Sequence, residues 1–244
     1  MNLDSIRIVL VATSHPGNIG STARAMKTMG LKRLYLVNPN LSPYRKAHEL
    51  AAGAFDILQE AVVVKSLPEA LEGCQLVLAT SARPRDIALP GLSPYGSAEL
   101  IANHSDDTEI AIVFGREHAG LTNEELLQAH YHIQIPSDPN FSSLNLAQAV
   151  QVIAYEIRMR LLSPPATVTT KTNRQKNLLA TADDIERFYT HLENVLIDID
   201  FLKPSNPKKL LQRLRRLFNR TRLERVEISI LRGILTQIQS SLKS

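Results

Sequence analysis

Four segments of the chain combine small residues with hydroxyl, amide or charged side chains that could hold a ligand. They are ATSHPGNIGSTAR at 12–24, TSARPRD at 80–86, GREHAGLTNEE at 115–125 and PSDPNFSSLNLA at 136–147. Small residues allow backbone N–H and C=O groups to approach a ligand closely. In the first segment, glycines and an asparagine predict a loop that leads into a helix at 21–29, with Arg24 in its first turn. These segments predict a pocket built largely from backbone, with a cation beside it.

Several other kinds of site are disfavoured because their motifs are missing. The sequence contains no G-x-G-x-x-G, G-x-x-x-x-G-K-[ST], H-E-x-x-H or G-x-S-x-G pattern. Its single cysteine, Cys74, excludes an internal disulfide framework. His130 and His132 would share one face of a strand, but they lack a third ligand, so no metal site is expected. A nucleoside cofactor held by loop backbone fits these sequences better than the dinucleotide of an oxidoreductase.

The four segments follow short apolar runs that are typical of strands, and helical patterns lie between those runs. The predicted strands are 6–11, 34–37, 76–80, 110–114 and 132–135, and the predicted helices are 21–29, 67–71, 123–129 and 144–162. Gly30 and Gly73 follow two of the helices, where a left-handed residue ends a helix. Strands that alternate with helices predict an α/β fold with a parallel sheet covered on both faces. In such a sheet, ligands bind beyond the carboxyl ends of the strands.

The chain is expected to have three parts. Residues 1–162 form the α/β domain, residues 163–180 form a flexible linker rich in Pro, Thr and Lys, and residues 181–244 form a small all-helical domain. The net charge of +4 is concentrated in the last part, since residues 203–232 hold ten Lys and Arg against two Glu. Such a patch is typical of a protein that binds RNA or DNA, although a solvated helix face is the plainer interpretation.

Composition places further limits on the chain. Its 244 residues are 44% hydrophobic, which is enough for a sizeable core. The first residues lack the charged and apolar regions of a signal peptide, and no apolar run approaches membrane length. The sequence therefore predicts a cytoplasmic protein without a membrane partner.

Three motifs, in order, resemble those of the SpoU branch of the SPOUT methyltransferase superfamily. They are NIGSTAR, in which Asn18 and Arg24 are six residues apart, FGREHAGLT at 114–122 and IPSDPNFSSLNLAQAV at 135–150. The resemblance covers about the first two-thirds of the chain. The tail, with RFYTHLENVL and LRRLFNRTRLERVEISILRGIL, resembles the C-terminal extension of the TrmJ group of tRNA (cytidine/uridine-2′-O)-methyltransferases.

The resemblance implies a SPOUT domain with a C-terminal trefoil knot, S-adenosylmethionine as cofactor, and a homodimer that completes each active site. The implied reaction is methylation of the ribose 2′-hydroxyl of nucleotide 32 in the tRNA anticodon loop. Cofactor contacts are implied for Thr80, Ser81, Ala82, Gly115, Gly120, Ile135, Ser142, Ser143 and Leu144. The residues near the chemistry correspond to Asn18, Arg24, Glu117, Ser143 and Asn145.

Physical chemistry leaves the role of Arg24 open. The family's motif-one arginine is cast as a base, but the pKa of a guanidinium lies far above neutrality. A cation that holds a phosphate and stabilises the developing alkoxide is the preferred hypothesis. Plainer interpretations also exist: a surface arginine at Arg24, an Arg116–Glu117 loop ion pair, and Ser142 and Ser143 as helix caps. Alternative functions are 2′-O-methylation of rRNA or another tRNA site, and an inactive RNA-binding SPOUT protein.

Overall fold

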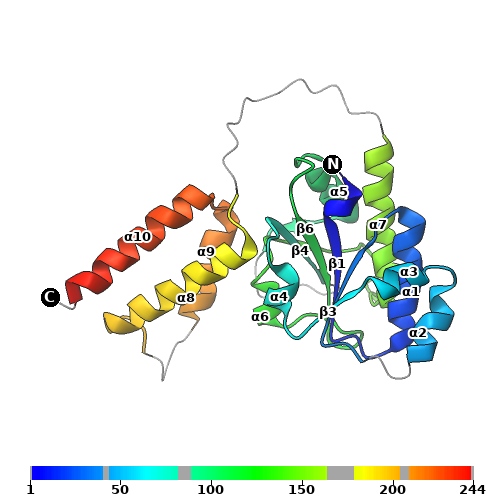
Figure 1. Ribbon diagram of the computed structural model, residues 1–244, viewed down its shortest axis with the longest axis horizontal. Coiled ribbons are helices and arrows are strands. Elements are labelled where there is room, and N and C mark those ends of the chain that lie inside the picture. Colours follow the sequence, from blue (N-terminus) through cyan, green and yellow to red (C-terminus); the bar gives the residue numbers. More distant parts are fainter. Residues whose placement is uncertain (1, 41–43, 82–88, 164–178, 204–208, 243–244) are drawn as a thin grey trace.

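The computed structural model describes residues 2–40, 44–81, 89–163, 179–203 and 209–242 (Figure 1). Most of the predicted linker, 164–178, lies outside these ranges, as does Ala82. Every helix within the described ranges is too short or too polar to span a lipid bilayer.

Seven strands form one sheet whose neighbouring strands all pair in parallel, in the order β3-β2-β1-β6-β4-β7-β5. The strands are β1 (Ile6–Val11), β2 (Arg33–Val37), β3 (Val62–Val64), β4 (Leu76–Thr80), β5 (Gly91–Leu92), β6 (Ile110–Phe114) and β7 (Tyr131–Ile133). The predicted parallel sheet is therefore confirmed. The short edge strands β3 and β5 were not predicted, and β7 ends at Ile133 rather than at Ile135.

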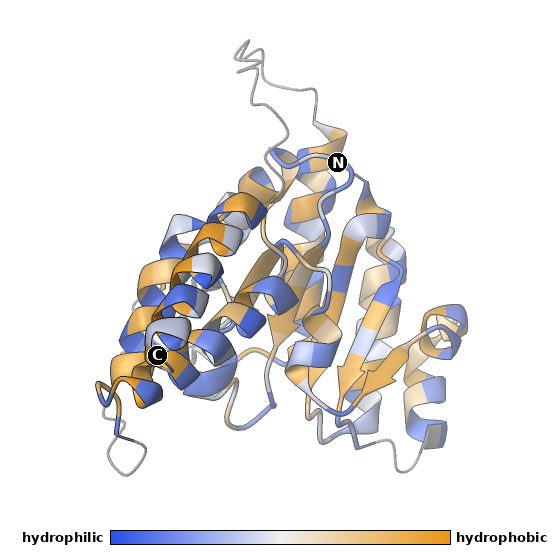
Figure 2. Ribbon diagram, turned by 60° about the vertical axis from the view of Figure 1, so that its left-hand side comes forward, coloured by the Kyte–Doolittle hydropathy of each residue, from blue (hydrophilic) through white to orange (hydrophobic). Residues whose placement is uncertain are grey.

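Helices cover both faces of the sheet, because alternate residues of the central strands point to opposite sides. The α/β part contains the short 3-10 helix η1 (Leu3–Ser5) and helices α1 (Pro16–Met29), α2 (Tyr44–Ala51), α3 (Phe55–Gln59), α4 (Leu67–Leu71), α5 (Pro94–Ala102), α6 (Asn123–Leu126) and α7 (Leu146–Leu162). From β1, Ile8 and Leu10 join the core under α1, α5 and α7, whereas Val9 and Val11 join the core under α4 and α6. The apolar strands lie between helices with polar outer faces (Figure 2).

Helix α1 begins at Pro16, so the prediction of a loop through Asn18 and of Arg24 in the first helical turn is wrong. Proline is well suited to the first position of a helix, where its missing N–H costs nothing. Gly20 serves close packing rather than a turn, because a Cβ added there would lie 2.0 Å from the carbonyl oxygen of Ala47 in α2. The glycines and asparagine of this motif therefore lie on the first turns of a helix.

Helix α7 begins at Leu146, two residues later than predicted, and α6 ends at Leu126 rather than at Ala129. The side chain of Asn145 caps α7 by accepting a hydrogen bond of 2.9 Å from the N–H of Ala147. The proposed caps Ser142 and Ser143 do not serve this end. Helix α7 packs between α1 and α5. The trefoil knot stays a prediction, because strand order alone does not define how the chain is threaded.

The C-terminal region is helical, as predicted, and consists of α8 (Ala182–Asp198), α9 (Leu210–Thr221) and α10 (Arg225–Leu242). These helices, called the helical module below, enclose a core of their own around Phe188, Val195 and Leu235. The module lies beside the α4 and α6 side of the sheet (Figure 1). Hydrogen bonds join the two parts, including Ala182 N–H to the Cys74 carbonyl at 2.8 Å and Gly73 N–H to the Asp183 carboxylate at 3.0 Å.

The close contact at Gly20 predicts a different response to the same substitution in two helices. Gly20→Ala should lower the free energy of unfolding by about 1–3 kcal/mol, because the added methyl group meets the α2 backbone. Gly233→Ala in α10 should raise it by up to about 1 kcal/mol, because a Cβ there meets nothing within 4 Å and alanine favours helix. Urea unfolding of both variants measures the difference. Equal changes in the free energy of unfolding in the two variants would show that α1 and α2 can move apart at little cost.

Candidate functional site

A pocket of about 360 Å³ lies where the loops after β4, β6 and β7 meet the start of α7. Eight of the predicted cofactor residues line it: Thr80, Ser81, Gly115, Gly120, Ile135, Ser142, Ser143 and Leu144. The ninth, Ala82, lies outside the described residues. Glu117 also lines the pocket, together with apolar side chains of Leu121, Leu126 and Ile133. The structure thus brings together segments that are 64 residues apart in sequence, from Thr80 to Leu144.

The loop after β6 forms one wall of this pocket and is held in a tight conformation. A Cβ at Gly115 would lie 2.2 Å from the carbonyl carbon of Gly120, and Gly120 has a φ of +67°. The backbones of Arg116 and Gly120 exchange two hydrogen bonds of 3.2 and 2.9 Å. Only glycine fits at Gly115, so the backbone itself forms the pocket wall.

Arg116 stabilises the same loop from outside. Its guanidinium binds both carboxylate oxygens of Glu125 at 2.9 and 3.0 Å, and Glu125 also completes the capping box of α6 with Thr122. The plainer interpretation of Glu117 as the ion-pair partner of Arg116 is therefore wrong. The carboxylate of Glu117 is left available for other donors.

Glu117 is the centre of a hydrogen-bond network that joins three of the predicted catalytic residues. Its carboxylate accepts from the Asn18 amide at 2.8 Å, and the Asn18 carbonyl oxygen accepts from the Asn145 amide at 3.0 Å. The Glu117 carboxylate also accepts from the backbone N–H and hydroxyl of Ser14 at 3.1 and 2.9 Å, and from His15 N–H at 3.3 Å. The network connects the loop after β1, the loop after β6 and the N-terminus of α7.

The network keeps Glu117 ionised. Partial burial would raise the pKa of this carboxyl, but the donors from Asn18 and Ser14 outweigh burial and lower the pKa to about 2. Ser14 and His15 were not predicted as site residues. The hydroxyl of Ser14, four residues before Asn18, could have suggested Ser14 as a hydrogen-bond donor. The backbone N–H groups of Ser14 and His15 could not be predicted, because nearly every residue type carries such a donor.

Arg24 lies apart from this network. It is exposed on α1, outside the residues that line the pocket, and it has no ion pair or side-chain hydrogen bond among the described residues. The structure therefore brings Asn18, Glu117 and Asn145 together, places Ser143 in the pocket wall, and leaves Arg24 facing solvent.

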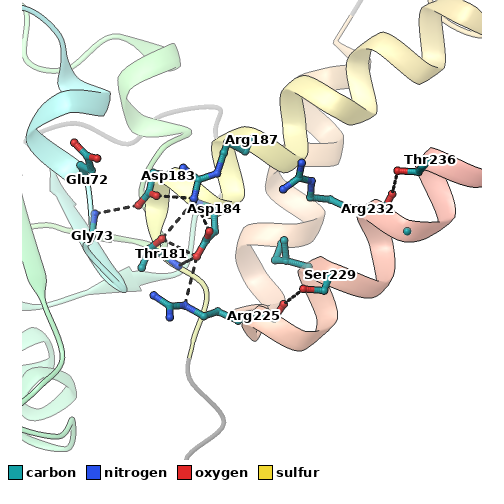
Figure 3. Close-up of a pocket in the computed structure, with 12 residues that line it drawn as sticks. Glu72, Gly73, Thr181, Asp183, Asp184, Arg187, Arg225, Ser229, Arg232 and Thr236 are labelled. Carbon is teal, nitrogen blue, oxygen red and sulfur yellow. Dashed lines mark hydrogen bonds and ion pairs between the residues drawn. The ribbon is translucent and has the colours of Figure 1, made fainter. Parts of the chain in front are cut away.

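A larger groove of about 770 Å³ lies elsewhere, between the Glu72–Gly73 turn and helices α8 and α10 (Figure 3). Two of its three arginines have acidic partners: Arg187 binds Asp183 and Asp184 at 2.8 and 2.6 Å, and Arg225 lies 3.5 Å from Asp184. The third, Arg232, has no ion pair within the described residues. The groove contains none of the motif residues. Its ion pairs belong to the junction between the module and the α/β part.

The remaining candidates from the sequence have structural roles. His130 is buried and its Nδ1 accepts from the N–H of Val77 at 3.0 Å, while burial lowers its pKa to about 4. Burial raises the pKa of Cys74 to about 12, so this thiol is a small apolar group. Within the described ranges, no group of three His, Cys, Asp or Glu side chains could hold a metal ion.

The parallel sheet and the pocket beyond its strand ends define an α/β protein with a small-molecule-sized pocket in its motif loops. The SpoU rRNA Methylase family model matches residues 5–155, so the chain belongs to this family. The model of the C-terminal domain of the tRNA methyltransferase TrmJ matches residues 183–244.

Full-length relatives support the assignment. The tRNA (cytidine/uridine/adenosine-2′-O-)-methyltransferase TrmJ of Pseudomonas aeruginosa is 53% identical over 97% of this chain and 95% of its own. The crystal structure of TrmJ from Z. mobilis matches with a TM-score of 0.84 at 33% identity, over 96% of this chain and 98% of that one. A probable methylase family protein from Haemophilus influenzae matches with a TM-score of 0.63 at 43% identity, over 99% of both chains.

The network around Glu117 predicts a pH-dependent contribution to stability. Glu117→Gln should lower the free energy of unfolding by about 1–2 kcal/mol at pH 7, because an amide cannot accept from all these donors. The difference between the two proteins should shrink as the pH falls from 4.5 towards 2, because acid protonates the unfolded carboxyl before the folded one.

Urea unfolding at several pH values measures this difference. Glu124→Gln is the control, since Glu124 is exposed on the neighbouring helix α6 and its carboxylate has no partner among the described residues. A constant difference between wild type and Glu117→Gln at all pH values would contradict the assigned network.

Proposed function

We propose that this protein transfers a methyl group from S-adenosylmethionine to the ribose 2′-hydroxyl of cytidine or uridine 32 in the tRNA anticodon loop. The observation that carries the proposal is that the second and third family motifs line one pocket, while the first motif joins them through the hydrogen-bond network of Asn18, Glu117 and Asn145. The names of the TrmJ relatives, which act on tRNA ribose, supply the reaction class.

The residues of the pocket fit this cofactor. Its volume of about 360 Å³ lies within the usual range for small-molecule sites, about 300–1,000 Å³. Leu121, Ile133 and Leu144 offer an apolar wall for a base, and Gly115 presents backbone without a side chain. When bound, S-adenosylmethionine supplies an electrophilic methyl group carried on a sulfonium.

The protein's own contribution in this proposal is alignment and charge stabilisation. The Glu117 network holds the pocket loops in one arrangement, and alignment of well-held reactants is worth about 7–11 kcal/mol. Arg24 acts as a cation that holds a phosphate and stabilises the negative charge on the ribose oxygen, since a guanidinium does not lose its proton near neutral pH. The proton of the hydroxyl then leaves to solvent or to a phosphate oxygen.

The position of Arg24 supports a homodimer. An exposed arginine outside the pocket of its own chain is available to the pocket of a second copy. Helix α7, which packs against α1, also exposes the large apolar side chains of Tyr155, Met159 and Leu162. In this proposal residues 1–162 are the catalytic domain, residues 163–180 are the linker, residues 181–244 bind tRNA, and the protein works in the cytoplasm.

Methyl transfer to bulk tRNA is the direct test. The purified protein should transfer label from methyl-labelled S-adenosylmethionine to tRNA, and nucleoside analysis should find 2′-O-methylcytidine or 2′-O-methyluridine at position 32. A label at another tRNA position or in rRNA would replace the proposed substrate. Binding of RNA without binding of the cofactor, measured by calorimetry, would indicate an inactive RNA-binding protein.

Arg24 can be tested against a neighbouring cation of the same helix. Arg24→Ala should lower kcat by about 10²- to 10³-fold, because charge stabilisation in the transition state is lost, while calorimetric affinity for S-adenosylmethionine stays within twofold. Lys27→Ala should leave kcat unchanged, since Lys27 binds Asp56 of α3 at 2.9 Å. A pH–rate titration present in wild type and absent from Arg24→Lys would instead favour Arg24 as the base.

A further inference from the structure

Helix α9 carries a line of cations that have no partners. Lys209 at its N-cap and Arg213, Arg216 and Arg220 are all exposed, and none has an ion pair or side-chain hydrogen bond in the described part of the chain. Their spacing of i, i+4, i+7 and i+11 places them within about 60° of one another on the helix surface, over a length of about 16 Å. We call these four residues the basic stripe.

Several other arginines of the module already have acidic partners, whereas Arg232 of α10 has none among the described residues and lies on a different helix from the stripe. Arg187 pairs with Asp183 and Asp184 in the groove of Figure 3, and Arg215 pairs with Glu186 and stacks on the ring of Tyr189. Helix α9 itself contains no Asp or Glu. A row of like charges on one face costs stability through repulsion, and a polyanion is the ligand that relieves this cost.

One side of α9, about 90° around the helix from the stripe, is joined to the α/β part through a buried amide. Asn219, only 5% exposed, donates to the carbonyl of Leu127 at 2.7 Å and to the carbonyl of Ala129 at 3.5 Å. Its own oxygen accepts from the Tyr189 hydroxyl at 2.8 Å. Asn219 therefore joins the module to the connection between α6 and β7.

That connection is continuous with the pocket. Leu126, just before it, and Ile133, at the end of β7, both line the pocket. A helix held at this connection keeps its outer face at a constant distance from the pocket. RNA bound on that face would be held in register with the reacting group.

We propose that the basic stripe binds successive phosphates of the tRNA backbone, and that Asn219 is a positioning residue that sets where this bound RNA lies relative to the pocket. This inference rests on the proposed function and names the surface and the contact through which the helical module would serve it.

The first experiment removes charge from the stripe. Arg213→Gln combined with Arg216→Gln should weaken tRNA binding roughly 10- to 50-fold at about 0.1 M salt. Log affinity should also fall less steeply with log salt, with the magnitude of the slope smaller by about 1.4–1.8. The matched control combines Arg45→Gln and Arg187→Gln, which remove two exposed cations that already pair with Glu49, Asp183 and Asp184. Equal losses in the two double variants would overturn the stripe as a specific surface.

The second experiment separates positioning from binding. Asn219→Asp keeps the acceptor for Tyr189 but places an oxygen against the Leu127 carbonyl, so α9 should lose its fixed position against the connection between α6 and β7. We expect kcat on tRNA to fall at least tenfold, with tRNA affinity within threefold of wild type. Tyr189→Phe, which removes the contact within the module only, should leave kcat within twofold. Similar kcat losses in both variants, or a loss of tRNA affinity in Asn219→Asp, would overturn the positioning role.

The two proposals fail in different ways. If the wild-type protein transfers no methyl group to tRNA, the proposed function fails, while the salt dependence of RNA binding still decides the stripe. If the wild type is active and the stripe variant binds tRNA as tightly as wild type, the inference about the stripe is wrong and the proposed function stands.

Discussion

The pocket depends on one ionised carboxylate that holds separate loops together. Glu117 follows β6, yet its donors come from Ser14, His15 and Asn18 beyond β1, and Asn18 in turn accepts from Asn145 at the start of α7. An ionised carboxylate only accepts hydrogen bonds, and it offers about four lone-pair positions, which these donors occupy. The loops can therefore keep a common geometry without a metal or a disulfide between them, and the low pKa keeps the centre charged over the whole neutral range.

Much of the fold could be predicted because burial on both faces leaves a simple record in sequence. The strands β1, β4 and β6 and the helix α4 have the predicted bounds, since each is a short apolar run between polar or glycine-containing turns. The edge strand β3 was missed although Val62–Val64 is itself an apolar run, because it is only three residues long and Val62 and Val63 are exposed rather than buried. The start of α1 was missed for another reason. Gly20 suggested a loop, but it is a glycine because α2 packs closely against α1 there, and a contact between two helices leaves no local pattern in the sequence.

The residues of the site could be predicted where the topology of the sheet brings them together. They could not be predicted where their position depends on single side-chain contacts. Gly115, Ile135 and Leu144 line one pocket because the carboxyl ends of parallel strands meet at one edge of the sheet. A surface position for Arg24 was the plainer of two interpretations of the sequence, and the motif alone did not decide between them. Asn219 was equally invisible, since an amide inside a basic, leucine-rich helix gives no sign that it binds the backbone of another domain.

For a polyanion, charge pairing rather than cavity volume decides which surface of the helical module is the better site. Two of the three arginines in the larger groove, Arg187 and Arg225, are paired with acids, so a phosphate there would compete with carboxylates already in contact and would find one cation, Arg232, without an ion pair among the described residues. The four cations of the stripe on α9 face solvent without competitors among the described residues. A phosphate that arrives there displaces only water and counterions, and release of counterions favours binding. For a polyanion, therefore, the open stripe is a better site than the deeper groove.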